Sequence, residues 1–357
     1  MATVDELRAR GEIGGRTVQV EPDGSVACVA YDPAPLAPGA VRVRTVRSAV
    51  SPGTEATFLG RAASNVHLAK RWNESLRIFE PGAPSDSYPM AFGYRAAGRV
   101  EESASDAVPV GARVWGSWRH TELVALSGNQ AAAQLLPDGL DWSDAVDIGQ
   151  MGPICLNAAA FGGGAQVASP AVVFGAGPIG LITAQAVRMS GASPVVVVDR
   201  LRSRLDIAAG LGLEVLEASA GADVAAKLKG RFGADGIPVG WECSGAVPAL
   251  NEAIRTVARR GLVVAVGFYQ GGASALMLGE EFHHNGVRIV CGQIGNPYGG
   301  LTRRDLQLRT LELAVAGHLV LGGLPRRTMP VAEAAAGFDA LTRPDELLQV
   351  EFAYDVA

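Results

Sequence analysis

The sequence predicts an α/β protein of two domains, a β-rich part and a doubly wound parallel sheet. After residue 155, apolar runs begin near residues 171, 195, 213, 239, 262 and 287, which leaves room for one crossover helix between successive strands. The first of these runs ends in a glycine turn at residues 175–180. Residues 1–150, in contrast, contain short strand-prone runs separated by proline and glycine turns.

The β-rich part is expected to form a partly open barrel. Its clearest strand-prone runs are Thr17–Val20, Val26–Ala30, Ala40–Val46 and Arg113–Trp115. After residue 300 the pattern predicts a helix over Arg304–Ala316 and a final short strand over Leu348–Tyr354.

Residues 62–90 interrupt the β-rich pattern. The polar run Ala62–Ile78 is predicted to be helical, and Glu80–Ser87 is predicted to be a loop. Such an insertion is either a binding loop or a solvated surface excursion. If it binds substrate, the secondary candidate side chains are His67, Lys70 and Tyr88.

The glycine turn has the pattern of a dinucleotide-binding fingerprint. Gly175 permits the tight turn, Gly177 lets the backbone approach a pyrophosphate, and Gly180 lets the following helix pack on the sheet. That helix begins at Pro178 and Ile179, where unpaired N–H groups and the positive end of the helix dipole would face the phosphates.

Asp199 closes the second apolar run, Val195–Val198. Its carboxylate can accept both hydroxyls of an adenosine ribose and would repel a 2′-phosphate, so NAD is favoured. Arg200 could hold a phosphate and keeps NADP open. Ser244 and Gly267 end the fourth and fifth predicted strands, where a doubly wound sheet binds its ligand, so both are predicted to contact the coenzyme.

Composition excludes several classes of protein. The chain has 357 residues, a net charge of −5 and no basic block, which argues against nucleic acid and membrane partners. No uncharged apolar span reaches membrane length, and the N-terminus does not resemble a signal peptide. The four cysteines are scattered, as in reduced proteins. We therefore expect a cytoplasmic protein.

These motifs together resemble the medium-chain dehydrogenase/reductase superfamily, through V-V-V-V-D-R, W-E-C-S-G and V-V-A-V-G. The resemblance implies a GroES-like catalytic domain over residues 1–155, completed by 301–357, and a Rossmann domain over 156–300. It also implies an active site in the cleft, a small-molecule substrate, Gln293 near the nicotinamide, and a homodimer or homotetramer. S-P-G-T-E, F-H-H-N and G-Q-I-G further resemble threonine-dehydrogenase-like and bacteriochlorophyllide-dehydrogenase-like members.

The sequence departs from that family at its zinc positions. Catalytic zinc needs three N, S or O protein ligands. The matching segments are Pro52-Gly-Thr-Glu55, Gly93-Tyr94-Arg95 and the region near Gln150–Pro153, whose proline, tyrosine and arginine cannot supply that set. Residues 95–120 also lack the cysteines of a structural zinc lobe. We therefore predict that the protein binds no zinc or other metal.

Tyr94, Arg95 and Glu55 are the predicted catalytic residues. Tyr94 would donate a proton, with a neighbouring cation lowering the pKa of its phenol. Arg95 would be that cation, or would hold an anionic or polyhydroxylated substrate. Glu55 would pair with Arg95, and the alternative is that this pair only fills the vacated metal site.

Three other histidines are predicted to have no catalytic or metal-binding role. His120 is predicted to lie on the surface. His283 and His284 would point to opposite faces of an extended strand, so a cap or interface role is favoured over metal binding.

The predicted function is therefore zinc-independent oxidoreduction between an alcohol and a ketone, with NAD or NADP. The substrate would be a polar small molecule such as a sugar, a cyclitol or a specialised metabolite. The alternatives are an ene or imine reductase of the same fold, a net non-redox reaction that uses bound NAD transiently, and a non-catalytic nucleotide-binding protein.

Overall fold

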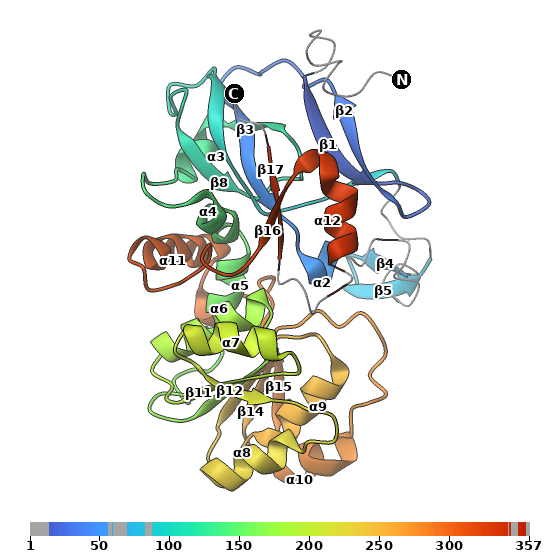
Figure 1. Cartoon of the computed structure of the whole chain (residues 1–357), viewed down its shortest axis with the longest axis vertical. Helices are drawn as coiled ribbons and strands as arrows, with labels where there is room; N and C mark the ends of the chain where they lie inside the picture. Colours follow the sequence, from blue (N-terminus) through green and yellow to red (C-terminus); the bar gives the residue numbers. More distant parts are fainter. Residues whose placement is uncertain are drawn as a thin grey trace. The chain divides into compact units, whose positions relative to one another are not determined.

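A computed structural model describes residues 14–55, 59, 70–82, 88–341, 343 and 349–354. The chain divides into two compact units (Figure 1): a first unit of Met1–Gln150 with Pro325–Ala357, and a second unit of Met151–Leu324. The second unit extends beyond the expected range 156–300 at both ends. Helices α5 (Met151–Ala160) and α11 (Arg303–Val315) account for this, because they pack together, with Gly152 directly against Thr310.

The second unit contains a six-stranded parallel sheet in the order β12-β11-β10-β13-β14-β15. Its strands begin where the apolar runs predict, and they are β10 (Ala171–Phe174), β11 (Val195–Asp199), β12 (Glu214–Glu217), β13 (Val239–Glu242), β14 (Leu262–Ala265) and β15 (Arg288–Cys291). The chain reverses its direction of travel across the sheet between β10 and β13. This is the switch point at which doubly wound sheets bind ligands.

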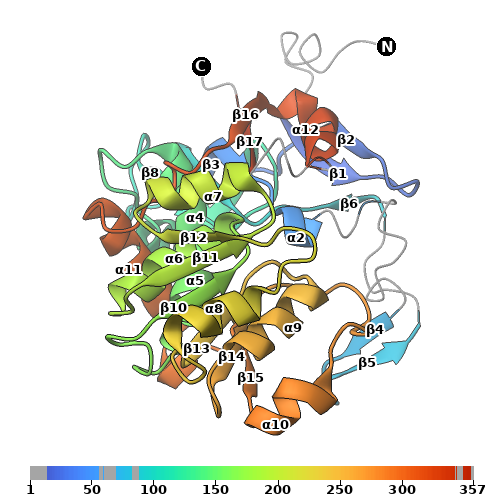
Figure 2. The same ribbon diagram turned by 60° about the horizontal axis from the view of Figure 1, so that its bottom comes forward.

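Helices cover both faces of this sheet, since right-handed crossovers place the two halves of the fold on opposite sides (Figure 2). They are α6 (Pro178–Met189), α7 (Arg202–Gly210), α8 (Val224–Phe232), α9 (Val247–Thr256) and the short α10 (His283–Asn285). The valine-rich strands pack against α8 and α9 in a core that includes Val172, Val196, Leu228 and Ile254. Among the described residues, no helix is long and apolar enough to cross a membrane.

The first unit is β-rich, as predicted, and its strands pair antiparallel except for the last two of the chain, which are parallel to each other. One sheet has the order β2-β1-β6, and a larger one has the order β16-β17-β3-β7-β8 with β9 also paired to β3. The strands are β1 (Gly15–Val20), β2 (Val26–Tyr31), β3 (Ala40–Ala49), β6 (Met90–Ala91), β7 (Ala96–Ser103), β8 (Arg113–Gly116), β9 (Leu123–Ser127), β16 (Arg327–Pro330) and β17 (Val350–Ala353). The predicted strands of this part are confirmed, and so is the α/β fold class.

Short helices complete the first unit: α2 (Pro52–Glu55), α3 (Gly128–Ala133), α4 (Trp142–Ile148) and α12 (Ala334–Ala340). The terminal segment belongs to this unit because β17 pairs with β3, and Phe352 lies against Phe338 of α12 in its core. The helix predicted at Arg304–Ala316 is also confirmed, as α11 of the second unit.

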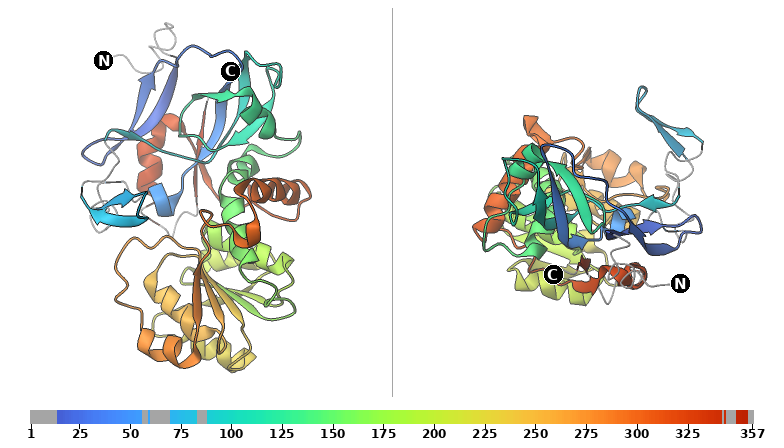
Figure 3. Two further views of the ribbon diagram at one scale, coloured as in Figure 1. Left: turned by 180° about the vertical axis from the view of Figure 1, so that it is seen from behind. Right: turned by 90° about the horizontal axis from the view of Figure 1, so that it is seen from above.

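The helical prediction for Ala62–Ile78 is wrong where the structure describes this segment. Lys70–Asn73 (β4) and Ile78–Pro81 (β5) form a hairpin, visible in Figure 3. The Asn73 carboxamide fixes the turn, because it accepts the Leu76 N–H at 3.0 Å and donates to Glu80 at 2.8 Å. Trp72 packs on Phe79 across the strands. His67 and the loop residues 83–87 lie outside the described residues.

Candidate functional site

The glycine turn has the geometry expected of a dinucleotide-binding fingerprint. Gly175 has a φ of +98°, and a Cβ there would lie 3.0 Å from the Ser244 backbone nitrogen. A Cβ on Gly180 would lie 1.7 Å from the Gly175 carbonyl oxygen, so only glycine allows α6 to start this close to β10. Gly177 is the residue before α6, and Pro178 and Ile179 open the helix. The free N–H groups of this helix start are thereby set at the switch point.

Asp199 lies at the end of β11 and is bound to the same turn. Its Oδ2 accepts the Ala176 N–H at 2.6 Å and its Oδ1 accepts the Leu201 N–H at 2.9 Å. These bonds hold the carboxylate beside the glycine turn, and the side chain remains partly exposed. Its position therefore suits an acceptor for ribose hydroxyls.

Two arginines follow Asp199 closely in the sequence and could contact the phosphate groups of a coenzyme. Arg200 is exposed. Arg204, in the first turn of α7, places its Nη1 3.9 Å from where a Cβ of Gly177 would be. The sequence analysis missed Arg204, although its position five residues after Asp199, at a predicted helix start, was the available signal. Both cations are candidates for contact with a coenzyme phosphate.

Glu242 is a second residue that the sequence analysis missed. It is fully buried at the end of β13, where it accepts the N–H groups of Ser244 at 2.8 Å and Gly245 at 3.1 Å. It also accepts the Ser244 hydroxyl and the Tyr269 hydroxyl, the latter at 2.5 Å. Burial raises the pKa of Glu242, and burial next to Glu242 raises the pKa of Tyr269 well above its usual range.

The turns after β13 and β14 are held together by this carboxylate. A Cβ on Gly267 would lie 2.2 Å from the Gly245 nitrogen and 2.8 Å from Glu242 Oε2. The Gln293 amide donates to the Val266 carbonyl, so its nitrogen is engaged by the backbone after β14. Ser244, Gly267 and Gln293 thus all lie at the carboxyl ends of β13, β14 and β15, as predicted for coenzyme-binding residues.

In the first unit, Tyr94 is half-buried and lies among polar groups of α2. The hydroxyls of Ser51 and Thr54 hydrogen-bond its phenol. Burial raises the pKa of Tyr94, and the nearby Glu55 carboxylate raises it further. The Arg95 charge lowers the pKa of Tyr94 to a smaller degree. The predicted cation is therefore present, but the pKa of Tyr94 is still raised. The Tyr94 phenol is therefore neutral at physiological pH and carries a proton that it could donate.

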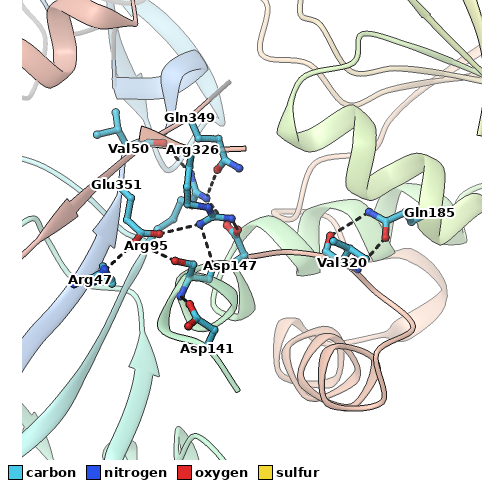
Figure 4. A network of polar contacts seen from close by, with 11 residues as sticks. Arg47, Val50, Arg95, Asp141, Asp147, Gln185, Val320, Arg326, Gln349 and Glu351 are labelled. Carbon is cyan, nitrogen blue, oxygen red and sulfur yellow. Dashed lines mark hydrogen bonds and ion pairs between the residues drawn. The ribbon is translucent and has the colours of Figure 1, made fainter. Parts of the chain in front are cut away.

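Arg95 does not have the predicted position. It is fully buried, and its guanidinium donates to Asp147, to Gln349 Oε1 at 2.8 Å and to the Val50 carbonyl at 2.8 Å (Figure 4). Arg326, 3.6 Å from Asp147, continues the network to Glu351 at 3.0 Å. The described contacts of Arg95 are thus all with buried groups of the protein, which favours the alternative that this arginine is structural.

Glu55 pairs with His120, and the predicted Glu55–Arg95 pair is absent from the described contacts. His120 Nε2 lies 2.9 Å from Glu55 Oε2, and both side chains are buried, so the surface assignment of His120 is wrong. The aromatic rings of Phe92, Phe338 and Phe352 surround the imidazole. An apolar core of this kind makes the surface position impossible.

The hydrogen bonds around His120 form one consistent chain. If Glu55 is ionised, Nε2 donates to it, and Nδ1 must then accept the Ser48 hydroxyl, 2.7 Å away. The Ser48 oxygen in turn accepts from Tyr354, 2.8 Å away. Glu55 Oε1 is buried and has no hydrogen-bond partner among the described residues. The carboxylate therefore keeps one free acceptor near Tyr94.

The side chains described around Tyr94 do not form a set of zinc ligands. Pro52 and Tyr94 lie in the segments that the sequence analysis matched to the family's metal positions, and His120 uses both ring nitrogens in the chain above. Across the described residues, no group of three or more His, Cys, Asp or Glu side chains could hold a metal ion. His283 and His284 lie in the helical turn α10 and not in an extended strand, with their rings 5.5 Å apart.

Comparison with known proteins places these features in context. The model of the zinc-binding dehydrogenase family matches residues 178–304. A D-guloside 3-dehydrogenase of Shigella flexneri is 30% identical over 312 residues, which cover 82% of this chain and 86% of that protein.

Two solved structures show the same fold. 2R,3R-butanediol dehydrogenase from Bacillus subtilis has a TM-score of 0.75 at 19% identity, over 96% of this chain and 100% of that chain. A protein from Sinorhizobium meliloti 1021, solved with NADP bound, has a TM-score of 0.73 at 19% identity, over 95% of this chain and 99% of that chain.

Proposed function

Because the chain belongs to the medium-chain dehydrogenase/reductase superfamily, we propose that it is a zinc-independent oxidoreductase that interconverts an alcohol and a ketone. One observation carries the proposal: the Tyr94 phenol is hydrogen-bonded by Ser51 and Thr54 next to the Glu55 carboxylate. A phenol in this state can polarise and protonate a substrate oxygen, which is the task of a Lewis acid in zinc enzymes.

The coenzyme would be held by the second unit. The backbone at Gly177 and the first turn of α6 would receive the pyrophosphate, and Asp199 would accept the ribose hydroxyls. Asp199 favours NAD, while Arg200 and Arg204 leave NADP possible. When bound, the reduced nicotinamide supplies the hydride that the protein itself cannot supply.

In ketone reduction, the Tyr94 hydroxyl would donate its proton to the carbonyl oxygen as the carbonyl carbon receives the hydride. The products are the alcohol, the oxidised coenzyme and a tyrosinate, which regains its proton from solvent through the Ser51 and Thr54 hydroxyls. In alcohol oxidation the same groups act in reverse. The raised pKa of Tyr94 favours the donor form at neutral pH.

The substrate would be a polar small molecule that carries a secondary alcohol or a ketone. The relative named D-guloside 3-dehydrogenase supports a sugar or a related polyol over an apolar alcohol. We further propose that the protein is cytoplasmic. We also propose that it forms a homodimer or homotetramer, and light scattering of the purified protein would measure the mass of this assembly.

The direct test is to incubate the purified protein with NADH or NADPH and a panel of keto-sugars and keto-cyclitols, with absorbance at the nicotinamide band as readout. Loss of coenzyme absorbance with an alcohol product supports the proposal. Deuterium transferred from labelled coenzyme to a carbon that carries a hydroxyl supports alcohol–ketone chemistry. Deuterium on a reduced C=C or C=N bond would instead identify an ene or imine reductase. Coenzyme binding without turnover of any substrate would contradict it.

A further inference from the structure

A pocket of about 540 Å³ lies in the second unit, away from the residues assigned to the coenzyme. It is lined by the first residues of three parallel strands, Val239, Leu262 and Arg288, and by the turn that follows α5. Gly175, Asp199 and Ser244 lie at the other ends of the strands of this sheet. The pocket is therefore at the amino-terminal edge, opposite the fingerprint.

The lining of this pocket is strongly cationic. Arg259, Arg260 and Arg288 contribute to it, and none of its described lining residues is acidic, although the whole chain carries a net charge of −5. Arg259 has a distant ion pair with Asp235 at 3.8 Å. No ion pair is found for the side chains of Arg260 and Arg288 among the described residues. A pocket of this charge in an acidic protein is suited to an anion.

Arg260 has an unusual backbone. Its φ is +60°, a conformation that costs an arginine steric energy and that glycine adopts freely. Two bonds fix this turn, because the Arg260 N–H donates to the Asn285 carbonyl at 2.7 Å and the Gly261 N–H donates to the Ala258 carbonyl at 2.8 Å. A strained residue held in place at a pocket points to a role for its side chain.

Apolar groups form the remainder of the lining. The rings of Phe161 and Tyr298 lie 5.1 Å apart at the pocket, and Val239 and Leu262 are buried beneath it. A small inorganic ion would leave these surfaces without a contact. The lining therefore matches a ligand that combines a phosphate with an apolar body.

We propose that this pocket binds an organic phosphate monoester, with Arg260 and Arg288 on the phosphate and the Phe161 and Tyr298 rings beside the apolar part. Planar guanidinium groups can form paired hydrogen bonds with phosphate oxygens. The site does not depend on the proposed redox function, since it lies at the opposite edge of the sheet.

The test is calorimetric titration of phenyl phosphate into the full-length protein, saturated with NADH so that the coenzyme site does not compete. We expect saturable binding with a Kd below about 1 mM. The double variant Arg260→Gly with Arg288→Gln should weaken it about tenfold or more. The control Arg202→Gln removes an exposed arginine of α7 and should leave the Kd unchanged.

Arg260→Gly also separates binding from folding. Because glycine adopts the positive φ without strain, this variant should melt no earlier than the natural protein while it binds phenyl phosphate less well. Absence of saturable binding, or equal binding by the double variant, would overturn the site. Inorganic phosphate that binds as tightly as phenyl phosphate would overturn the organic ligand.

Discussion

His120 Nε2 lies 2.9 Å from Glu55 Oε2 in the interior of the first unit, and both groups are buried. Glu55 is thus bound by His120, whereas Arg95 belongs to a separate network with Asp147. Two separate sets of buried polar groups are therefore present, one with Glu55 and His120 and one with Arg95 and Asp147. Tyr94 directly precedes Arg95 in the sequence, and the charges of Glu55 and Arg95 both affect the pKa of its phenol. Of the three predicted catalytic residues, Tyr94 is the one whose side chain is partly exposed.

Replacing Tyr94 with Phe should lower kcat by about 10²–10⁴-fold, since the proton donor is lost while the ring is kept. The Kd for NADH should not change, because the coenzyme-binding residues are in the second unit. Tyr31→Phe is a matched control, since that phenol bonds the Leu123 carbonyl and should affect stability only. Steady-state kinetics and NADH fluorescence titration measure both quantities, and an unchanged kcat for Tyr94→Phe removes this role.

The pH dependence of alcohol oxidation should follow the Tyr94 phenol. Oxidation needs the base form, so kcat/KM should rise with pH up to a pKa above the ordinary value of about 10, because burial and Glu55 both raise it. In Glu55→Gln the negative charge is gone, so the alkaline limb should move to lower pH. Asp206→Asn, an exposed acid on α7, should leave the limb in place. A limb that stays or moves upward in Glu55→Gln would contradict the assignment.

Arg95→Met should destabilise the protein by about 3–5 kcal/mol, because it leaves the buried Asp147 carboxylate with Arg326 alone at 3.6 Å. The double variant Arg95→Met with Asp147→Leu should recover part of this loss, since no charge is then stranded. Arg202→Gln breaks an exposed pair and should cost less than about 1 kcal/mol. Urea unfolding measures these differences, and an Arg95→Met cost as small as that of the control would show that the network is dispensable.

Asp199→Asn should shift coenzyme preference toward NADP. The amide keeps an oxygen for the Leu201 N–H but no longer repels a 2′-phosphate, and Arg200 and Arg204 are close in sequence to receive one. We expect the ratio of kcat/KM for NADPH over NADH to rise about tenfold or more. If this ratio does not change, Asp199 does not determine the preference between NADH and NADPH.

Much of the fold could be predicted because its signals are local. The six strands of the second unit start where apolar runs start, and Gly175 to Asp199 form a continuous motif whose contacts are between near neighbours in sequence. The strands Lys70–Asn73 and Ile78–Pro81 were missed, because the Asn73 side chain fixes their turn and a polar composition does not reveal such a bond.

The polar networks of the first unit could not be predicted, since their partners are distant in sequence. Arg95 contacts Gln349, and His120 contacts Ser48 and Glu55, from separate strands and helices. The residues next to a histidine in the sequence do not reveal whether its side chain is exposed or is buried among aromatic rings. The pairing of β3 with β7 and β17 brings segments that are distant in sequence close to one another.

In the proposed mechanism, organic side chains, and no metal ion, act on the substrate oxygen. Elemental analysis by plasma mass spectrometry, on the same preparation whose turnover is measured before and after prolonged chelator treatment, tests it most directly. We predict far less than one zinc per chain and full turnover after chelation. One zinc per chain, together with activity that is lost on chelation and restored by zinc, would show that a metal ion acts on the substrate oxygen.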